Sequence, residues 1–360
     1  MRETYSNFKQ SQNPAIHAAI YFSYPLDKAA SLCYYKGIEK RRNNMRYTPP
    51  TFDNLNEMAF IDVCRLTEDE ARAILEKIRW PEAPTCPHCG SLKVTRLQAK
   101  SKKVRDGLIQ CNDCRQQFTV TVGTVMENTK ITLRQWIQAF HSMCSHKKGV
   151  SALQLQRNLG LGSYRSAWHL SHRIREAMKE GPLAAALRGT VEVDETYIGG
   201  KSREGKRGRG SERKTPVVTM VERKGRARSK SVGNVNADTL KAAIRENVDR
   251  KSTIMTDEWP SYRGIGREFA GGHEVIRHAM GEYSIGNVST NTAESYFALL
   301  KRGVHGTFHH ISKQHLDRYC DEFSFRWNLR EVTDGERAAQ AVKSMEGKQL
   351  KLKSLMGWVN

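Results

Sequence analysis

Residues 190–200 read TVEVDETYIGG, and this stretch decides how the second half of the chain folds. Val191, Val193 and Tyr197 alternate with polar residues, which predicts a β-strand, and the two glycines at its end allow a sharp turn. Acidic side chains crowd the same strand, and neighbouring carboxylates repel one another unless a cation or a polar partner neutralises them. We therefore expect a divalent metal ion at this strand; an ordinary strand whose acidic side chains face water is the alternative.

The composition favours a nucleic-acid partner. Lys and Arg number 59 and Asp and Glu number 38 among 360 residues, which gives a formal net charge of +21 with neutral histidines. Such an excess attracts polyanions, and nucleic acid is the polyanion that we expect. An acidic membrane surface is the alternative, but no run approaches the roughly 18 to 20 apolar residues that span a bilayer. We expect a cytoplasmic protein of two or three domains that does not enter membranes.

Four of the eight cysteines form two tight pairs, Cys86-Pro-His-Cys89 and Cys111-Asn-Asp-Cys114, with 21 residues between them. Two such turns facing each other give the tetrahedral sulfur site that Zn²⁺ prefers, and the segments that follow each pair read as hairpin strands. We predict a zinc ribbon over residues 83–124 that binds one Zn²⁺. Four thiolates leave no open coordination position, so this metal is expected to be structural. A redox pair is the alternative.

The two ends of the chain have weaker patterns. Residues 1–56 show no sustained periodicity and contain the basic run KRRNNMR, so we expect a disordered tail. Residues 57–82 predict a short helical segment, in which Thr67 and Glu70 have the spacing of a capping box. Residues 331–360 read as a basic C-terminal tail, or as a helix without an assignable role.

Residues 130–181 contain three segments with helical periodicity. A glycine-containing turn precedes the last of them, over 163–179, which is rich in Arg and His, and this arrangement matches a helix-turn-helix. A solvated helical linker is the alternative. In the helix-turn-helix interpretation the last helix offers these side chains to DNA: Tyr164, Arg165, His169, His172 and Arg173.

A basic loop follows the acidic strand. Residues 199–214 contain seven Lys or Arg, two Glu and five Gly, which gives a net charge of +5. A loop of this composition cannot pack but can wrap phosphate groups, although charge runs also occur as solvated surface. We assign these cationic residues to DNA binding: Lys201, Arg203, Lys206, Arg207, Arg209, Arg213 and Lys214.

Two further acidic residues stand at the ends of predicted elements. Beyond the basic loop we predict two strands, a helix, and then a strand that ends at Asp257; EVIRH is a candidate for a fifth strand. A helix over TAESYFALLKRG follows and carries Glu294 in its first turn. Asn291, Glu294 and Lys301 share one face of this helix, which suits a metal site with a phosphate ligand. Polar residues that only keep a helix soluble are the alternative.

The order of these elements resembles a known fold. A strand with Asp194, two strands, a helix, a strand with Asp257 and a helix with Glu294 are similar to the ribonuclease H-like fold of the DDE transposase and retroviral integrase superfamily. The separations are 63 residues from Asp194 to Asp257 and 37 from Asp257 to Glu294. The motifs that carry the resemblance are the ribbon, DETYIGGK (194–201), TDEW (256–259), NTAE (291–294), and GxFH with RYxDEFxFRxN (306–328). Over roughly residues 57–330, the chain resembles a bacterial insertion-sequence transposase of the zinc-ribbon DDE type.

This resemblance implies a multidomain α+β protein. An N-terminal zinc ribbon and helix-turn-helix would precede an α/β ribonuclease H-like catalytic domain over residues 188–330. Asp194, Asp257 and Glu294 would hold two Mg²⁺ or Mn²⁺ ions, with Asp194 bridging them and Asn291 and Lys301 as helpers. Three nearby acids rank below these three as ligands: Glu192, Glu195 and Glu258.

The activity that the resemblance implies is DNA transposition. The protein would bind the terminal inverted repeats of its element, cleave a strand with water and join the freed 3′-hydroxyl to target DNA. Its partners would be double-stranded DNA of the element ends and the target, and further copies of the chain in at least a dimer, in the bacterial nucleoid. Two alternatives stay open: a catalytically silent, sequence-specific DNA-binding regulator, and a hydrolytic nuclease without strand transfer.

Overall fold

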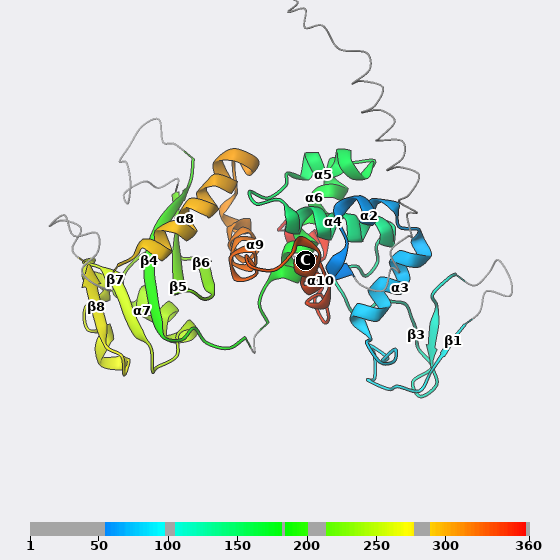
Figure 1. Ribbon diagram of the computed structural model, residues 1–360, viewed down its shortest axis with the longest axis horizontal. Helices are drawn as coiled ribbons and strands as arrows, with labels where there is room; N and C mark the ends of the chain where they lie inside the picture. Colours follow the sequence, from blue (N-terminus) through cyan, green and yellow to red (C-terminus); the bar gives the residue numbers. More distant parts are fainter. Residues whose placement is uncertain (1–54, 98–104, 182–183, 201–213, 277–288, 358–360) are drawn as a thin grey trace, which may run out of the picture. The chain divides into compact units, whose positions relative to one another are not determined.

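The computed structural model describes residues 55–97, 105–181, 184–200, 214–276 and 289–357 (Figure 1). It has a mixed α/β structure with one three-stranded and one five-stranded sheet in this part of the chain. Of the tail predicted over 1–56, residues 1–54 lie outside the described residues, whereas residues 55 and 56 belong to a short helix. Six of the proposed DNA-binding residues also lie outside: Lys201, Arg203, Lys206, Arg207, Arg209 and Arg213. No described helix combines the length and apolar character that crossing a lipid bilayer requires.

The first described elements are short helices. They are η1 (Leu55–Glu57), α2 (Phe60–Arg65) and α3 (Glu68–Arg79). The predicted capping box is confirmed, because Glu70 N donates to Thr67 Oγ1 at 3.3 Å and Thr67 N donates to Glu70 Oε2 at 2.8 Å. This cap starts α3, whose buried Ile74 and Leu75 join the first hydrophobic core.

A small antiparallel sheet follows, with β1 (Val94–Arg96), β2 (Ile109–Cys111) and β3 (Gln117–Phe118) in that order. Ile109 and Phe118 are fully buried, and the ring of Phe118 meets Trp80 edge to face with centroids 5.8 Å apart. A core with so few apolar residues stabilises this sheet only weakly. A bound metal ion would therefore be important for its folding.

Helices occupy all three segments with predicted helical periodicity: α4 (Leu133–Ser145), α5 (Ala152–Leu159) and α6 (Tyr164–Met178). Thr132, Ser151 and Ser163 cap their N-termini through side-chain oxygens. Gly160 ends α5 with a φ of 62°, a left-handed conformation that glycine adopts without strain. The chain therefore turns sharply between α5 and α6.

The larger sheet has the strand order β6-β5-β4-β7-β8. Its strands are β4 (Thr190–Gly199), β5 (Lys214–Glu222), β6 (Ala227–Ser231), β7 (Thr253–Asp257) and β8 (His273–Ile276). The central strand β4 is the predicted acidic strand, and it is antiparallel to β5 and parallel to β7. The predicted fifth strand is present as β8.

Helices cover both faces of this sheet. Val191 and Val193 of β4 share a core with Leu240 of α7 (Ala237–Asn247). Ile198 of β4 belongs to a different core, which contains Ala293 of α8 (Asn291–Gly303). Since successive side chains of a strand point to opposite faces, Glu192 and Asp194 point to the α8 face with Ile198.

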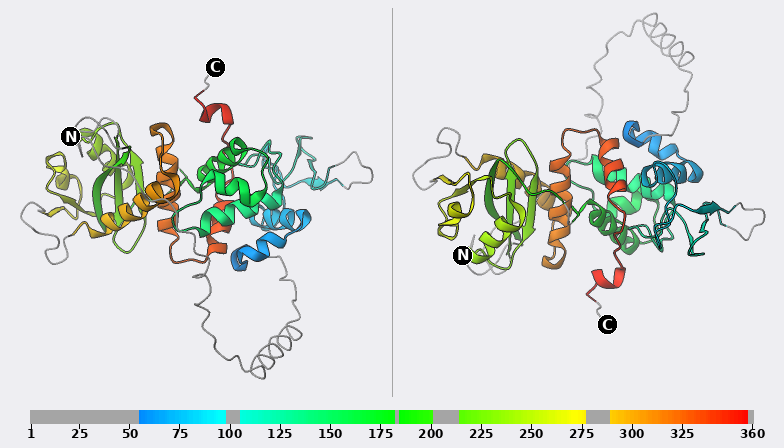
Figure 2. Two further views of the ribbon diagram at one scale, coloured as in Figure 1. Left: turned by 90° about the horizontal axis from the view of Figure 1, so that it is seen from above. Right: turned by 90° about the horizontal axis from the view of Figure 1, so that it is seen from below.

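Helix α9 (Leu316–Asn328) connects the sheet with the N-terminal helices (Figure 2). It follows a π-helical segment over Val304–Phe308 and a short turn, η7 (Lys313–His315), and it packs against both β6 and α6. Glu322 of α9 forms ion pairs with Arg175 of α6 at 2.5 Å and with Arg326 at 2.6 Å. Arg326 also donates to backbone carbonyls at the end of α4. This buried charge network fixes α4, α6 and α9 to one another.

Replacing Glu322 by Gln is expected to lower the free energy of unfolding by roughly 3–5 kcal/mol, because two buried guanidinium groups lose the carboxylate between them. Burial alone would raise the pKa of Glu322, but Arg175 and Arg326 outweigh burial and hold the pKa below its usual value. Urea-induced unfolding measures the loss. Glu331→Gln is the control, since the Glu331 side chain is 84% exposed. Equal stability of the two variants would contradict the expectation.

Residues 331–360, predicted as a basic tail or as a helix without an assignable role, contain a packed helix. Helix α10 (Asp334–Lys343) buries Ala338, Ala341 and Val342 in the core that also holds α3 and α4. A short helix, α11 (Leu352–Leu355), follows. The apolar face of α10 is made mostly of alanine, which gives a weak hydrophobic signal in the sequence, and charged residues surround it.

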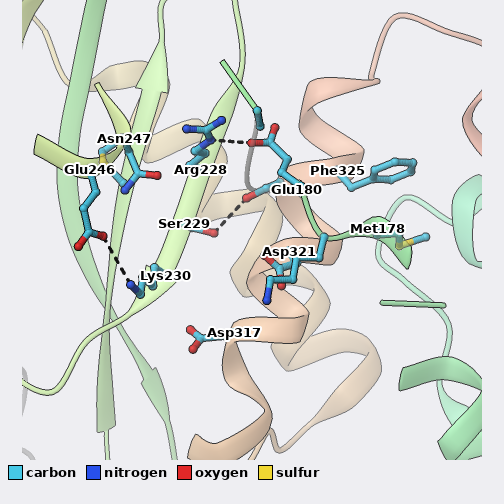
Figure 3. A pocket seen from close by; sticks show the side chains of 15 residues that line it. Met178, Glu180, Arg228, Ser229, Lys230, Glu246, Asn247, Asp317, Asp321 and Phe325 are labelled. Atoms are coloured by element: carbon cyan, nitrogen blue, oxygen red, sulfur yellow. Dashed lines mark hydrogen bonds and ion pairs between the residues drawn. The ribbon is translucent and has the colours of Figure 1, made fainter. Parts of the chain in front are cut away.

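A cavity of about 430 Å³ lies where the chain passes from α6 to the sheet (Figure 3). Charges of both signs line it and pair across it: Arg228 contacts Glu180 at 2.6 Å, and Lys230 contacts Glu246 at 3.8 Å. Asp321 of α9 also lines the cavity, and burial raises its pKa to about 7. The ion pair between Arg228 and Glu180 ties the segment after α6 to strand β6.

Candidate functional site

The four paired cysteines form one cluster, and their sulfur atoms all lie within 4.8 Å of one another. The Sγ atoms of Cys86 and Cys114 are 3.7 Å apart, and those of Cys89 and Cys111 are 3.6 Å apart. A tetrahedral Zn²⁺ site with Zn–S bonds of about 2.3 Å requires sulfur separations of about 3.8 Å, so the cluster fits this ion. Backbone N–H groups, first that of Cys114, lower the pKa of Cys111 to about 7, whereas the pKa values of Cys89 and Cys114 are raised, so without metal Cys111 is the thiol of these three that ionises first. These findings support one structural zinc ion.

Asp194 and Asp257 lie beside each other on neighbouring strands. Glu192 of β4 pairs with Met255 of β7 in a parallel ladder, and the same register continued by two residues sets Asp194 opposite Asp257. Both aspartates are half-buried. Asp194 lies two residues beyond Glu192, and Asp257 lies two residues beyond Met255, the partner of Glu192 in the sheet. Because side chains two residues apart on a strand point to the same face, both aspartates point to the α8 face with Glu192.

Glu294 lies at the same face because the first turn of α8 is hydrogen-bonded to β4. The Oε2 atom of Glu192 accepts hydrogen bonds from Thr292 N at 2.7 Å and from Ala293 N at 3.1 Å, and its Oε1 accepts one from Thr292 Oγ1 at 3.0 Å. The first turn of α8 is thereby held against β4, two residues before Asp194. Glu294 follows in that turn and is exposed.

The three carboxylates influence one another electrostatically. The pKa of Asp194 is raised to about 7, by burial first and then by the charges of Glu195, Asp257 and Glu294, against a lowering hydrogen bond from Glu195 N. Their ligand atoms are not as close together as those of the cysteines, which are the one group of three or more potential ligands within 4.8 Å in the described ranges. Carboxylates that hold two ions about 3.5–4 Å apart span more than the shell of a single ion.

The other acidic residues of these strands have different positions. Glu195 is buried and accepts a hydrogen bond from the Tyr262 hydroxyl at 2.7 Å, on the α7 side of the sheet. Glu258, just beyond β7, is exposed. Glu192 is fully buried beneath α8. Glu192 and Glu195 therefore have structural partners of their own.

The proposed helper residues share one surface. Asn291, Glu294 and Lys301 of α8 are all exposed, in agreement with the predicted polar face of this helix. The Lys301 ammonium lies 5.7 Å from the centroid of the Phe297 ring. The stripe therefore runs from the first turn of α8, which holds Glu294, to its last turn, which holds Lys301.

The proposed DNA-binding residues of α6 divide into two groups. Tyr164 and Arg165, at the start of the helix, are exposed, whereas His169 is half-buried and contacts Leu350 O at 3.0 Å through Nε2. His172 and Arg173 are buried, and their assignment to a DNA-facing surface is wrong. Arg173 donates to the carbonyl of Glu127 and lies over the Trp136 ring. The helix is polar at its N-terminal end and enters the core at its C-terminal end, which a local count of Arg and His does not distinguish.

Lys214, from the basic loop, is half-buried at the start of β5.

Sequence reasoning missed the role of Glu192 and its partner Arg223. Arg223 Nε contacts Glu192 Oε1 at 2.8 Å, and another nitrogen of Arg223 donates to Ser289 just before α8. The periodicity of the strand places residues 192 and 194 on one face, and this was the only indication of a shared role in the sequence. The sequence did not show which element covers that face.

The chain matches two models of transposase domains. Residues 186–328 match the ISXO2-like transposase domain, and residues 66–117 match the transposase zinc-ribbon domain. The cysteine cluster lies in the region similar to a transposase zinc ribbon, and the acidic sheet lies in the region similar to a transposase domain.

A relative from an archaeon extends this comparison. The chain is 29% identical over 283 residues to an uncharacterized protein in the transposable element ISH50 of Halobacterium salinarum. The aligned region covers 72% of this chain and 91% of the relative. The chain is therefore similar to transposase domains in two separate regions, one like a transposase zinc ribbon and one like an ISXO2-like transposase domain.

Proposed function

We propose that this protein is a DNA transposase that cleaves the ends of its insertion sequence and joins them to target DNA in a divalent-metal-dependent reaction. The main observation in support is the group formed by Asp194, Asp257 and Glu294, whose charges act on one another at one face of a sheet. The match to a transposase domain over residues 186–328 includes all three. In this proposal the three carboxylates are the catalytic DDE triad.

The domain plan that we propose has a ribonuclease H-like catalytic domain over residues 188–330. The strand order β6-β5-β4-β7-β8 supports it, with β4 antiparallel to β5 and parallel to β7 and with helices on both faces. A zinc ribbon over 83–124 and a helix-turn-helix over 130–181 precede this domain. The sharp turn between α5 and α6 supports the helix-turn-helix.

Asp194, Asp257 and Glu294 fit the requirements of divalent metal ligands. Mg²⁺ and Mn²⁺ prefer carboxylate oxygens, and a bound cation would stabilise the ionised form of Asp194, whose pKa is raised by burial and by its acidic neighbours. When bound, two such ions would activate a water molecule or a 3′-hydroxyl and stabilise the charge on the phosphate oxygens. Asp194, Asp257 and Glu294 would together hold these ions. Asn291 and Lys301, on the exposed face of α8, would contact the DNA backbone beside them.

DNA binding is proposed for the N-terminal half of α6 and for the basic loop after β4. Tyr164 and Arg165 are exposed where a recognition helix presents side chains to the major groove. Synapsis of two element ends requires at least a dimer. Such a protein would work on chromosomal DNA in the nucleoid of its host.

Arg165→Ala is expected to weaken binding to the element end and to reduce the slope of log K against log salt by about 0.9 if Arg165 contacts one phosphate. Fluorescence anisotropy with labelled end DNA at several salt concentrations measures both quantities. Lys343→Ala is the control, because Lys343 is exposed on α10 rather than on α6. Identical salt slopes for Arg165→Ala and the wild type would remove Arg165 from the DNA interface.

The proposed function is tested by incubating the protein with end DNA, a target plasmid and Mg²⁺ or Mn²⁺. A transposase gives free 3′-hydroxyl ends and then products in which these ends are joined to the target. Cleavage without joined products identifies a hydrolytic nuclease, and tight binding without cleavage identifies a regulator. Either of these two results overturns the proposal.

A further inference from the structure

The N-terminus of α8 lacks a cap from its own segment. Thr290 occupies the N-cap position but makes no side-chain hydrogen bond to the helix. The backbone N–H groups of Thr292 and Ala293, the second and third residues of the helix, donate instead to the carboxylate of Glu192. These are the two groups that an N-cap side chain normally satisfies. Glu192, a hundred residues earlier in the chain, therefore caps α8 from β4.

Glu192 is buried and contacts both a helix N-terminus and a guanidinium group. Its side chain is 0% exposed, and its partners are the helix N-terminus and Arg223. A carboxylate at a helix N-terminus is stabilised by the N–H groups and by the partial positive charge there. Arg223 also donates to the carbonyl and hydroxyl oxygens of Ser289, so it holds the segment that enters α8. The charge of Glu192 thus connects the strand, the helix and the entering segment.

This contact sets the distance between two members of the acidic group. Asp194 lies two residues after Glu192 on the same face of β4, and Glu294 lies in the turn of α8 that Glu192 caps. A displacement of the helix N-terminus would move Glu294 relative to Asp194. Groups that orient metal ligands without contacting the metal commonly affect metal affinity by about 10- to 100-fold.

We propose that Glu192 is a positioning residue, which fixes Glu294 against Asp194 by capping α8 and so sets the affinity of the acidic site for divalent metal. This inference rests on the proposed function, in which both residues bind the metal. Glu192 itself contacts neither metal nor DNA.

The test compares Glu192→Gln with Glu222→Gln. The side chain of Glu222 also accepts two backbone hydrogen bonds, from Arg188 N at 2.7 Å and from Arg226 N at 2.8 Å, and it lies on the adjacent strand β5. Calorimetric titration with Mn²⁺ is expected to give a dissociation constant about 10- to 100-fold higher for Glu192→Gln and an unchanged constant for Glu222→Gln. Hydrogen exchange at the Thr292 and Ala293 amides is expected to accelerate in Glu192→Gln alone.

The outcomes separate this inference from the proposed function. Unchanged Mn²⁺ affinity in Glu192→Gln, or an equal loss in Glu222→Gln, overturns the positioning role. Weaker Mn²⁺ binding and faster amide exchange in Glu192→Gln support it even if the wild-type protein cleaves no DNA, a result that would count against the transposase proposal only. Mn²⁺ that does not bind the wild-type protein at the acidic site overturns both.

Discussion

Asp194→Asn is expected to lower the rate of metal-dependent strand cleavage by at least about 10⁴-fold, which corresponds to roughly 5 kcal/mol of transition-state stabilisation. The amide keeps the shape of the side chain but removes the charge that would bridge two metal ions. The other two described carboxylates of β4 do not replace it, because Glu192 is hydrogen-bonded to α8 and Glu195 to Tyr262. Cleavage of labelled end DNA under single-turnover conditions measures the rate.

The control for this variant is Asp238→Asn, at an exposed position in the first turn of α7. It is expected to cleave at the wild-type rate. Both variants are expected to bind end DNA with wild-type affinity. If Asp194→Asn cleaves as fast as the control, Asp194 is not catalytic.

The same variant reports on charge repulsion at the acidic group. Burial, followed by its acidic neighbours, raises the pKa of Asp194 from 3.8 to about 7 in the metal-free protein. The folded protein then holds this proton more tightly than the unfolded chain does, so the contribution to stability present at low pH is lost as the pH rises towards about 7. The wild-type melting temperature without metal is therefore expected to fall with pH more steeply than that of Asp194→Asn. Asp321 also has a raised pKa, but it contributes equally to both proteins and cancels in the comparison.

Loss of zinc is the second prediction with a large expected effect. Cys111→Ser, or treatment with a strong chelator, is expected to unfold the ribbon, because structural zinc contributes on the order of 10 kcal/mol to the folding of comparable sites. The sheet β1-β2-β3 has only Ile109, Cys111 and Phe118 as buried side chains on its strands. Hydrogen exchange of the ribbon amides and the zinc content per chain measure the effect.

Cys64→Ser is the matched control for this experiment. Cys64 is exposed and lies outside the cluster of four cysteines. It is expected to keep one zinc ion per chain and wild-type exchange rates. A Cys111→Ser protein that retains zinc and a protected ribbon would show that the four sulfurs are not the metal site.

Much of this architecture could be predicted from local patterns. The spacing of the cysteines gave the cluster, the Thr67 and Glu70 pair gave a helix start, and alternation gave the acidic strand β4. Each of these features depends on residues close together in the chain. The juxtaposition of Asp194 with Asp257 and Glu294 came from a family resemblance, since no local pattern shows which strands become neighbours.

The features that were missed depend on contacts between distant segments. Arg173 resembles an exposed cation in the sequence, but the turn of α6 places it over Trp136 in the core. Glu192 resembles another member of an acidic run, and only the packing of α8 shows that it caps a helix. The packing of helix α10 was not predicted, because alanines form its buried face. In each case tertiary packing decides which side of an amphipathic segment is covered.

The ion network between α6 and α9 has a consequence for where DNA would be cut. Glu322 joins Arg175 to Arg326, and α9 in turn packs on β6 of the sheet that carries the acidic group. A terminal repeat of the element that is bound at the N-terminal end of α6 would therefore lie at a constant distance from Asp194. The broken bond would then fall a fixed number of nucleotides from the recognised sequence, and a variant that loosens this network would cut at scattered positions.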